Sequence, residues 1–204
     1  SFKPKDGSGN EDGGENFHGQ KRKNDTHVST TDPDSRLYRK AQGREAKLCD
    51  MGHALLENRN GLAVGGRVAQ ANGTAERRAS EALLKQKTKE TGKAATVGED
   101  KAYDTKDHVA ALRKLGVTPH VAQNNAKTKT GHHRQSAIDA RTTRHDGYGM
   151  SQTRRKMIEC IFGSGKQHGT MRKTKHRGLA CIAGDFLLNL IASNLIRIPI
   201  LVAA

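Results

Sequence analysis

The sequence predicts an α/β protein, and three observations carry the prediction. Two apolar runs flank a turn near residue 60, two amphipathic helix-like runs follow, and each of these helices leads into a short apolar run. Strands that alternate with helices are typical of α/β architecture. The chain has 204 residues, about the length of one domain, but only 33% of them are hydrophobic, so we expect a small core.

Residues 1–46 are predicted to form a polar and largely irregular arm. They consist mostly of Gly, Asp, Asn, Lys and Ser, and their few apolar side chains would bury too little surface to offset the entropy of ordering. The composition changes at Lys47. One apolar run reaches Glu57, the turn at 58–61 contains Asn-Gly, and a second run ends at Val68. This pattern predicts a β-hairpin.

Two helices and two strands are expected next. Thr74 can cap a helix that continues through Leu84, and residues 94–98 read as a strand that ends just before Asp100. Residues 104–107 can open a second helix that Gly116 stops, and residues 117–122 offer another strand.

The C-terminal third is predicted to be a basic linker or insertion at 127–147 followed by helices over 148–204. One helix is expected from Met150 to Lys166. The most apolar stretch, 179–204, is interpreted as a buried core helix rather than a membrane span. Polar residues interrupt that stretch and Pro199 breaks it, so it offers no clean apolar span.

The charge balance indicates a polyanionic partner. Lys and Arg number 36 against 21 Asp and Glu, which gives a net charge of +15 and a pI near 10.0. Residues 127–178 hold thirteen of the cations and three acids. Such a concentration favours contacts with DNA phosphates, with acidic membrane surface as a second partner class and a merely solvated face as the alternative.

Several other classes of site are not supported. The three cysteines, Cys49, Cys160 and Cys181, lie far apart, which fits a reducing compartment. Residues 163–166 look like the end of a phosphate-binding loop, but the required earlier Gly and following Ser or Thr are missing. The histidines at 132, 133 and 145 lack the partners of a zinc site.

Two acids are the best candidates for chemistry. Asp100 follows a short strand, a position where α/β folds expose functional groups. Glu159 lies on the predicted basic helix, where the helical repeat brings it to the same face as Arg155 and Lys166. From the residues alone, a plain surface ion pair explains this second cluster as well.

Many segments resemble bacterial insertion-sequence transposases of the DDE class, and the resemblance extends over nearly the whole chain. The segments are residues 24–27, 30–40, 51–55, 57–59, 75–77, 98–104, 117–124, 136–139 and 141–145. The C-terminal signature of that family is Tyr, then Arg, Glu and Lys separated by two, three and six residues. Arg155, Glu159 and Lys166 match its last three positions, whereas Gln152 stands at the Tyr position and Ser164 where relatives commonly have Trp.

The resemblance implies an RNase H-like mixed sheet with flanking helices, of which residues 47–204 form an incomplete catalytic domain. Asp100 resembles the second catalytic aspartate and Glu159 the third catalytic acid, both as metal ligands. The first aspartate and its strand would lie upstream of Ser1, so we expect an N-terminally truncated chain without the first strand. The implied cofactor is Mg²⁺ or Mn²⁺ in a two-ion site.

The implied activity is metal-dependent DNA strand cleavage and strand transfer at transposon ends. Its DNA contacts are expected from six cations: Arg155, Lys166, Arg154, Lys156, Arg172 and Lys173. The implied partners are terminal inverted repeats, target DNA and a second copy of the chain in a synaptic complex, with no membrane. We expect a cytoplasmic, nucleoid-associated bacterial protein.

Whether this chain is itself an enzyme stays open at this point, because the first aspartate is missing. We expect it to be inactive or impaired. The alternative is a non-enzymatic DNA-binding remnant of a transposase, and a weaker third interpretation is attachment to a membrane surface through the basic and apolar C-terminal segments.

Overall fold

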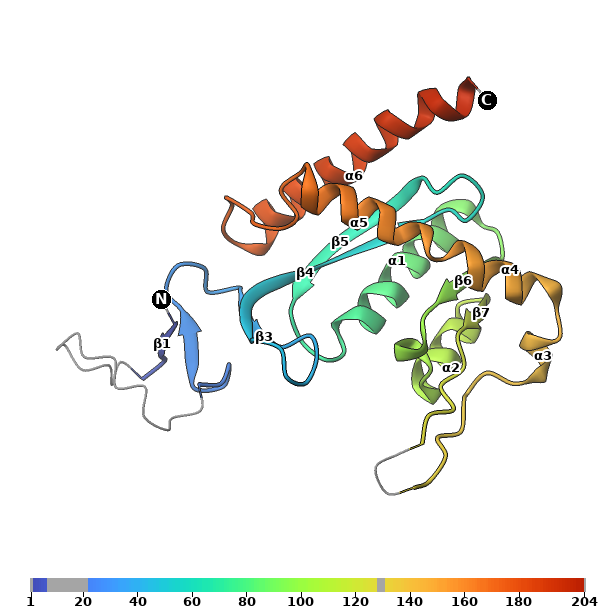
Figure 1. Cartoon of the computed structure of the whole chain (residues 1–204), viewed down its shortest axis with the longest axis horizontal. Helices are drawn as coiled ribbons and strands as arrows, with labels where there is room; N and C mark the ends of the chain where they lie inside the picture. The colour runs from blue at the N-terminus through green and yellow to red at the C-terminus, as the bar shows by residue number, and fades with distance from the viewer. Residues whose placement is uncertain (1, 7–21, 128–130, 204) are drawn as a thin grey trace.

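The computed structural model describes residues 2–6, 22–127 and 131–203, and these confirm a mixed α/β protein (Figure 1). In chain order the elements are β1 (Phe2–Pro4), β2 (His27–Ser29), β3 (Arg36–Tyr38), β4 (Lys47–Leu56), β5 (Ala63–Gln70), α1 (Ala75–Thr91), β6 (Ala95–Glu99), η1 (Lys101–Tyr103), α2 (Lys106–Lys114), β7 (Val117–Val121), α3 (Ala140–Thr143), α4 (Asp146–Arg154), α5 (Met157–Gln167) and α6 (Leu179–Val202).

The described strands form three small sheets. β1 pairs antiparallel with β2, β3–β4–β5 form an antiparallel meander, and β6 pairs in parallel with β7. The predicted hairpin is therefore confirmed as β4 and β5. Its turn is held by the carboxylate of Glu57, which accepts hydrogen bonds from the backbone N–H groups of Arg59, Asn60 and Leu62.

The long helix α6 packs across one face of the β4–β5 hairpin because two glycines let it approach closely. A Cβ atom placed on Gly66 would lie 2.4 Å from Leu190 Cδ1, and one on Gly52 would lie 2.6 Å from Phe186 Cε2. Asn194 adds a polar attachment, since its side-chain amide both accepts from the N–H and donates to the carbonyl of Ala63. This packing forms the smaller of the two cores.

The larger core lies between the β6–β7 sheet and helices α1 and α2. Its buried side chains are Leu84, Val97, Val109, Leu112, Val117, Val121 and Ile138. The helices begin and end close to the predicted positions. The Thr105 hydroxyl caps α2 as the sequence suggests. Thr74 is at the N-cap position of α1, but its side chain makes no capping hydrogen bond, because its hydroxyl donates to Asn72 instead.

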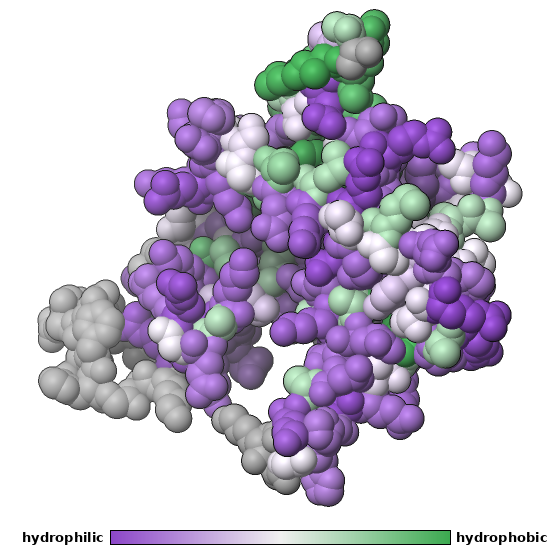
Figure 2. Space-filling view, turned by 45° about the vertical axis from the view of Figure 1, so that its right-hand side comes forward, coloured by the Kyte–Doolittle hydropathy of each residue, from purple (hydrophilic) through white to green (hydrophobic). Residues whose placement is uncertain are grey.

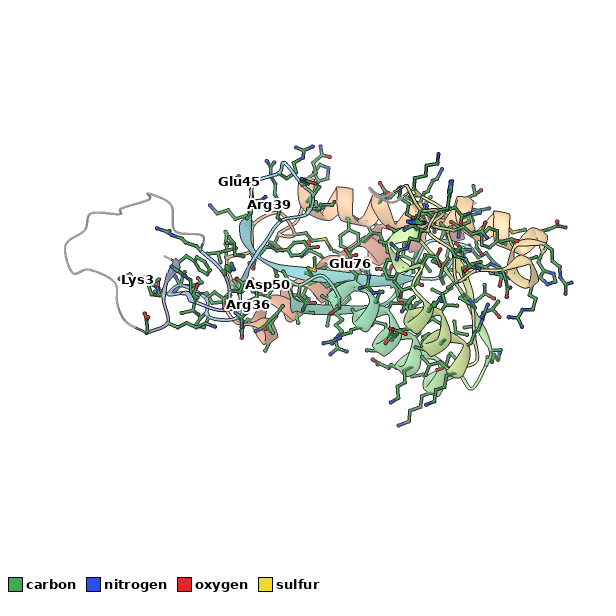
Figure 3. The ribbon with its side chains drawn as sticks, turned by 90° about the horizontal axis from the view of Figure 1, so that it is seen from below. Lys3, Arg36, Arg39, Glu45, Asp50 and Glu76 are labelled. Carbon is green, nitrogen blue, oxygen red and sulfur yellow. The ribbon has the colours of Figure 1, made fainter. Side chains whose placement is uncertain are left out.

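The expected irregular arm at 1–46 contains three short strands, and part of it is fixed to the C-terminal helix. Asp32 accepts a hydrogen bond from the backbone N–H of Gly178, and Asp34 accepts one from Leu179, so two carboxylates face the N-terminus of α6. Farther along, Arg36 lies close to Asp50 where β3 meets β4 (Figure 3). Asp32 and Asp34 therefore bind another element, whereas residues 39–45 of the arm are exposed, and residues 1 and 7–21 of this prediction lie outside the described residues.

The segment expected as a linker at 127–147 is also partly structured. It contains α3, and it is held near α2 by the buried Asp104, which accepts hydrogen bonds from the backbone N–H groups of Asn124 and Ala137. Residues 128–130 of this prediction lie outside the described residues.

The prediction of a single helix from Met150 to Lys166 is wrong, because the structure has two helices. α4 ends at Arg154 and α5 begins at Met157. The bonds from Ile158 N–H to the Arg155 carbonyl and from Glu159 N–H to the Lys156 carbonyl both span three residues, so the backbone tightens at the junction.

The buried core helix expected at 179–204 is correct on one face only. Ile182, Phe186 and Leu190 are buried, but most of the remaining large apolar side chains of α6 are exposed, and Pro199 lies inside the helix rather than ending it. Among the described residues α6 alone has the length and apolar composition needed to cross a membrane, a criterion that core helices of soluble proteins also meet.

Candidate functional site

A cavity of about 920 Å³ gathers most of the acids and cations singled out in the sequence. Its lining comes from β4 and β6, from α1, and from the junction of α4 with α5. The cavity is therefore formed where strand ends and helix ends meet, which is where α/β proteins commonly place functional side chains.

Asp100 enters this lining directly after β6. Parallel pairing with β7 fixes β6, and the Asp100 carboxylate then accepts a hydrogen bond of 2.7 Å from the backbone N–H of Ala102, which caps η1. Arg77 of α1 donates to the carbonyl of Ala102 and so attaches this loop to α1. Asp100 is exposed, and one of its carboxylate oxygens makes the capping bond.

The helix junction brings two cations and the second acid to the same cavity. Arg154 and Arg155 end α4, where cations interact favourably with the helix dipole, and Glu159 lies in the first turn of α5, where an acid does so. Each such interaction contributes about 0.3–1 kcal/mol. The three side chains line the cavity from two helices rather than from one helical face.

Gln152 positions Arg155. Its side-chain oxygen accepts a hydrogen bond of 2.9 Å from Arg155 Nε, and its side-chain nitrogen donates to the carbonyl of His120 on β7. Gly98 of β6 allows this approach, because a Cβ there would lie 3.1 Å from the Ser151 carbonyl oxygen. The residue that departs from the transposase signature thus links the guanidinium to the parallel sheet.

Lys166 completes the cationic side of the cavity from the last turn of α5. Its Nζ lies 5.8 Å from the centre of the Phe162 ring, a cation–π arrangement that directs the flexible side chain. Among the described residues no ion pair joins Glu159 to Arg155 or Lys166, so the surface ion pair considered from the sequence does not form.

Not every predicted site residue lies in this cavity. Asp100, Glu159, Arg154, Arg155 and Lys166 line it, whereas Lys156, Arg172 and Lys173 do not. All three of these outer cations are exposed. The cavity also contains Glu76, in the first turn of α1, which the sequence reasoning did not select. The signal was present, since Glu76 belongs to one of the segments that carry the resemblance.

Three carboxylates act on Tyr103 in the cavity wall next to Asp100. Burial and the charges of Glu76, Glu99 and Asp100 raise the pKa of Tyr103, so its phenol stays protonated. On β4, burial and the neighbouring Arg67 lower the pKa of His53 to about 4, so this imidazole is neutral at pH 7, and its buried Nε2 has no hydrogen-bond partner.

A buried network beneath the Asp100 loop was missed from the sequence. His108 of α2 bonds Glu99 of β6 through Nε2 at 2.9 Å and Glu81 of α1 through Nδ1 at 2.7 Å, and Glu99 also accepts from the Ser80 hydroxyl. Both imidazole nitrogens face carboxylates, so the protonated form is favoured. This network joins three elements immediately behind Asp100.

The side chains present do not fit the two-ion metal site that the resemblance implies. Asp100 and Glu159 line the same cavity, but in the described part of the chain no three or more His, Cys, Asp and Glu side chains gather into a group that could hold a metal ion. Hard divalent cations bind clusters of oxygen ligands, and the carboxylates that line the cavity, which also include Glu57, Glu76 and Glu99, do not gather into such a cluster.

Comparisons with known proteins identify the C-terminal part of the chain. The family model described as transposase DDE domain matches residues 113–199, which include Glu159 and the cations of the α4–α5 junction but not Asp100. Searches of curated proteins and of solved structures gave no significant match. Residues 113–199, somewhat less than half of the chain, are therefore similar to the transposase DDE domain family.

Proposed function

We propose that this chain serves in DNA transposition and that its cavity holds a segment of DNA backbone beside Asp100 and Glu159. One observation carries the proposal: five of the site residues expected from the sequence, Asp100, Glu159, Arg154, Arg155 and Lys166, line a single cavity, and four of the five lie within the family match. Cations bind phosphates in a manner that does not depend on base sequence, which suits a protein that must bind both transposon ends and target DNA.

The cations of α4 and α5 are proposed to bind the DNA phosphates. Arg155 offers a planar guanidinium oriented by Gln152, which suits bidentate contact with a phosphate, and Lys166 offers a point charge at the other end of the α5 face. We infer that Lys156, Arg172 and Lys173 extend the DNA contact outside the cavity. The partners proposed are terminal inverted repeats and target DNA in the cytoplasm, in association with the nucleoid.

The arrangement of strands supports an RNase H-like fold with one strand position empty. Residues 52–56 of β4 and the whole of β6 line the cavity, and among the described strands these residues of β4 pair only with β5, while β6 pairs with β7. A strand between β4 and β6 would join the meander to the parallel pair in one mixed sheet. We propose that this position corresponds to the first strand of the family fold.

The chain alone is proposed not to cleave DNA. Transposase DDE domains generally use divalent metal ions, which supply charge stabilisation for phosphoryl transfer, but the acids of the described residues form no group that could hold them. We therefore derive no reaction step through Mg²⁺ or Mn²⁺. A third carboxylate close to Asp100 and Glu159 would be needed to complete the metal site.

The test is a nicking and binding assay with the purified chain, DNA that carries the ends of the element, and Mg²⁺ or Mn²⁺. We expect DNA binding without metal-dependent nicking, and we expect Asp100→Asn and Glu159→Gln to bind at least as tightly, because each removes a negative charge near phosphate. Asp107→Asn, an exposed acid on α2, is the charge-matched control. Metal-dependent nicking would contradict the proposed inactivity, and absence of DNA binding would contradict the function.

A non-enzymatic DNA-binding remnant is the second candidate, and it is favoured because the acids of the described residues form no group that could hold a metal ion. The two candidates differ in cells that carry a marked copy of the element. If the acids contribute to strand cleavage in a completed assembly, Asp100→Asn and Glu159→Gln abolish excision that depends on this chain. If the chain is only a remnant, its expression supports no excision, and the two substitutions change nothing.

A further inference from the structure

We propose that a second cavity, at the start of α6, binds a phosphate monoester, that is, a phosphate group joined to one small organic group. This cavity has a volume of about 360 Å³ and is called the arm pocket. Its lining includes Ser29, Thr31 and Asp32 of the arm and Lys175, His176 and Arg177 of the segment before α6. It shares no lining residue with the cavity proposed for DNA, so this proposal goes beyond the proposed function and does not depend on it.

Three basic side chains line the arm pocket from consecutive positions. Lys175, His176 and Arg177 are all exposed, and among the described residues their side chains make no ion pair and no hydrogen bond. Lys175 and Arg177 carry permanent positive charges, which repel each other at short range. An anion placed between them would remove this repulsion and gain charge-assisted hydrogen bonds.

A buried hydroxyl lies at the arm side of the pocket. Ser29 is only 3% exposed, and its Oγ accepts a hydrogen bond of 3.1 Å from the backbone N–H of Asp32. A hydroxyl can donate as well as accept, but in the described part of the chain the O–H of Ser29 has no acceptor. A buried donor without an acceptor is unfavourable, so an acceptor oxygen in the pocket would stabilise this wall.

The two walls of the pocket are attached to each other through acids of the arm. Asp32 accepts a hydrogen bond of 3.1 Å from the backbone N–H of Gly178, and Asp34 accepts one of 3.1 Å from Leu179. The other carboxylate oxygen of Asp32 accepts from the N–H of Asp34 at 3.0 Å. Backbone dipoles at the start of α6 therefore compensate the charge of Asp32, the one acid in the lining.

The surroundings of the pocket are polar. It lies at the first turn of α6, at the opposite end of this helix from the exposed apolar turns that end it (Figures 1 and 2). Charge and hydrogen bonding therefore determine which ligand fits. Leu48 of β4, which is half-buried, is the one large apolar side chain in the lining and can contact an organic group carried by the phosphate.

A monoester suits the arm pocket better than the diester of a DNA backbone. At pH 7 a monoester carries a charge of about −1.5 to −2, which the permanent charges of Lys175 and Arg177 match, whereas each backbone phosphate carries a single charge. The guanidinium of Arg177 can contact two phosphate oxygens at once. The volume of about 360 Å³ is in the usual range for small-molecule sites, so it has room for a group attached to the phosphate.

The first experiment is isothermal titration calorimetry of the full chain, freed of nucleic acid, with deoxyadenosine 5′-monophosphate as the probe. Deoxyadenosine, which lacks the phosphate, is the ligand control. The pocket variant is Lys175→Gln with Arg177→Gln. The charge-matched control is Arg78→Gln with Lys85→Gln, two exposed cations of α1 that line neither cavity.

We expect the monophosphate to bind and deoxyadenosine not to bind. The pocket variant should bind the monophosphate about tenfold more weakly or worse, and the control variant should stay within about twofold of the wild type. Since all four substitutions change exposed side chains, both variants should fold, which thermal unfolding by circular dichroism checks.

Three results would overturn the arm pocket as a phosphate site. The chain could fail to bind the monophosphate at millimolar concentration, it could bind deoxyadenosine equally well, or the two double variants could weaken binding equally. Loss of monophosphate binding in Arg154→Gln, Arg155→Gln and Lys166→Gln, with full binding in the pocket variant, would also overturn it, because the phosphate would then lie in the other cavity. Duplex binding through that cavity is measured separately, so the two proposals fail independently.

A competition experiment identifies the source of the phosphate. Two short duplexes of the same sequence, one with 5′-phosphate ends and one with 5′-hydroxyl ends, are used to displace the bound monophosphate. If the pocket takes the end of a DNA strand, the phosphorylated duplex displaces the monophosphate at lower concentration. If the pocket takes a free phosphorylated small molecule, the two duplexes displace it equally. Either result supports the pocket, provided that the pocket variant has lost the binding.

Discussion

Replacing three of the cavity's cations should lower the salt dependence of DNA binding by a calculable amount. Arg154→Gln, Arg155→Gln and Lys166→Gln together remove the positive charges that α4, α5 and their junction contribute to the cavity, and leave Lys40 and Lys87, which also line it. Each phosphate that the protein no longer neutralises reduces the slope of log affinity against log salt by about 0.9, so three phosphates account for a change of about 2.7. Between about 50 and 200 mM salt, the wild type should therefore lose about 40-fold more affinity than the triple variant.

Fluorescence anisotropy of a labelled duplex at several salt concentrations measures this slope. The charge-matched control is Lys85→Gln, Lys89→Gln and Lys93→Gln, which removes three exposed cations on or just after α1 that do not line the cavity. We expect the control to keep nearly the wild-type slope. An equal reduction of slope in both triple variants would refute a localised DNA site, and an unchanged slope in the cavity variant would refute the cavity as that site.

Two further predictions concern the framework around the site. Burial by itself would lower the pKa of His108, but hydrogen bonds and charges from Glu99 and Glu81 outweigh it and raise the pKa above its ordinary 6.5. Stability from this network is therefore complete below about pH 6.5 and is lost as the pH rises through the folded-state pKa. Urea unfolding should show His108→Gln about 3 kcal/mol less stable than wild type at low pH, with the difference shrinking as pH rises; a constant difference would contradict a charged His108. Gly66→Val should cost about 1–3 kcal/mol because its side chain would collide with Leu190, whereas Gly163→Ala, which meets no atom within 4 Å, should cost nothing; equal effects of the two on the unfolding midpoint would contradict the close packing of α6.

Elements that depend on local pattern were predictable from the sequence. The β4–β5 hairpin follows from two apolar runs around a turn, and α2 follows from a capping Thr105 and a terminal Gly116. The break between α4 and α5 was not predictable, because no Pro marks it. It occurs where Gln152 bonds β7 and where α4 lies close against Gly98, two contacts with strands distant in sequence.

The residues of the site divide in the same way, into those that a local sequence pattern predicts and those that only contacts between distant segments bring together. Asp100 was found because it ends a strand, and Glu159 was found through a signature that continues to Lys166. The network of Glu81, Glu99 and His108 was missed because it joins two helices and a strand, and none of the three residues is unusual in its own segment. The Asp32 and Asp34 contacts with the start of α6 span about 145 residues, so only the folded chain reveals them.

The most direct test of the DNA site is a cross-linking map of the chain–DNA complex. Formaldehyde links lysines and arginines to bound DNA, and mass spectrometry then locates the modified residues. We expect the strongest links at Arg154, Arg155 and Lys166 around the cavity, with weaker ones at the exposed cations that precede α6. Links confined to cations outside the cavity, with Arg155 and Lys166 unmodified, would contradict the proposal that this cavity holds the DNA backbone.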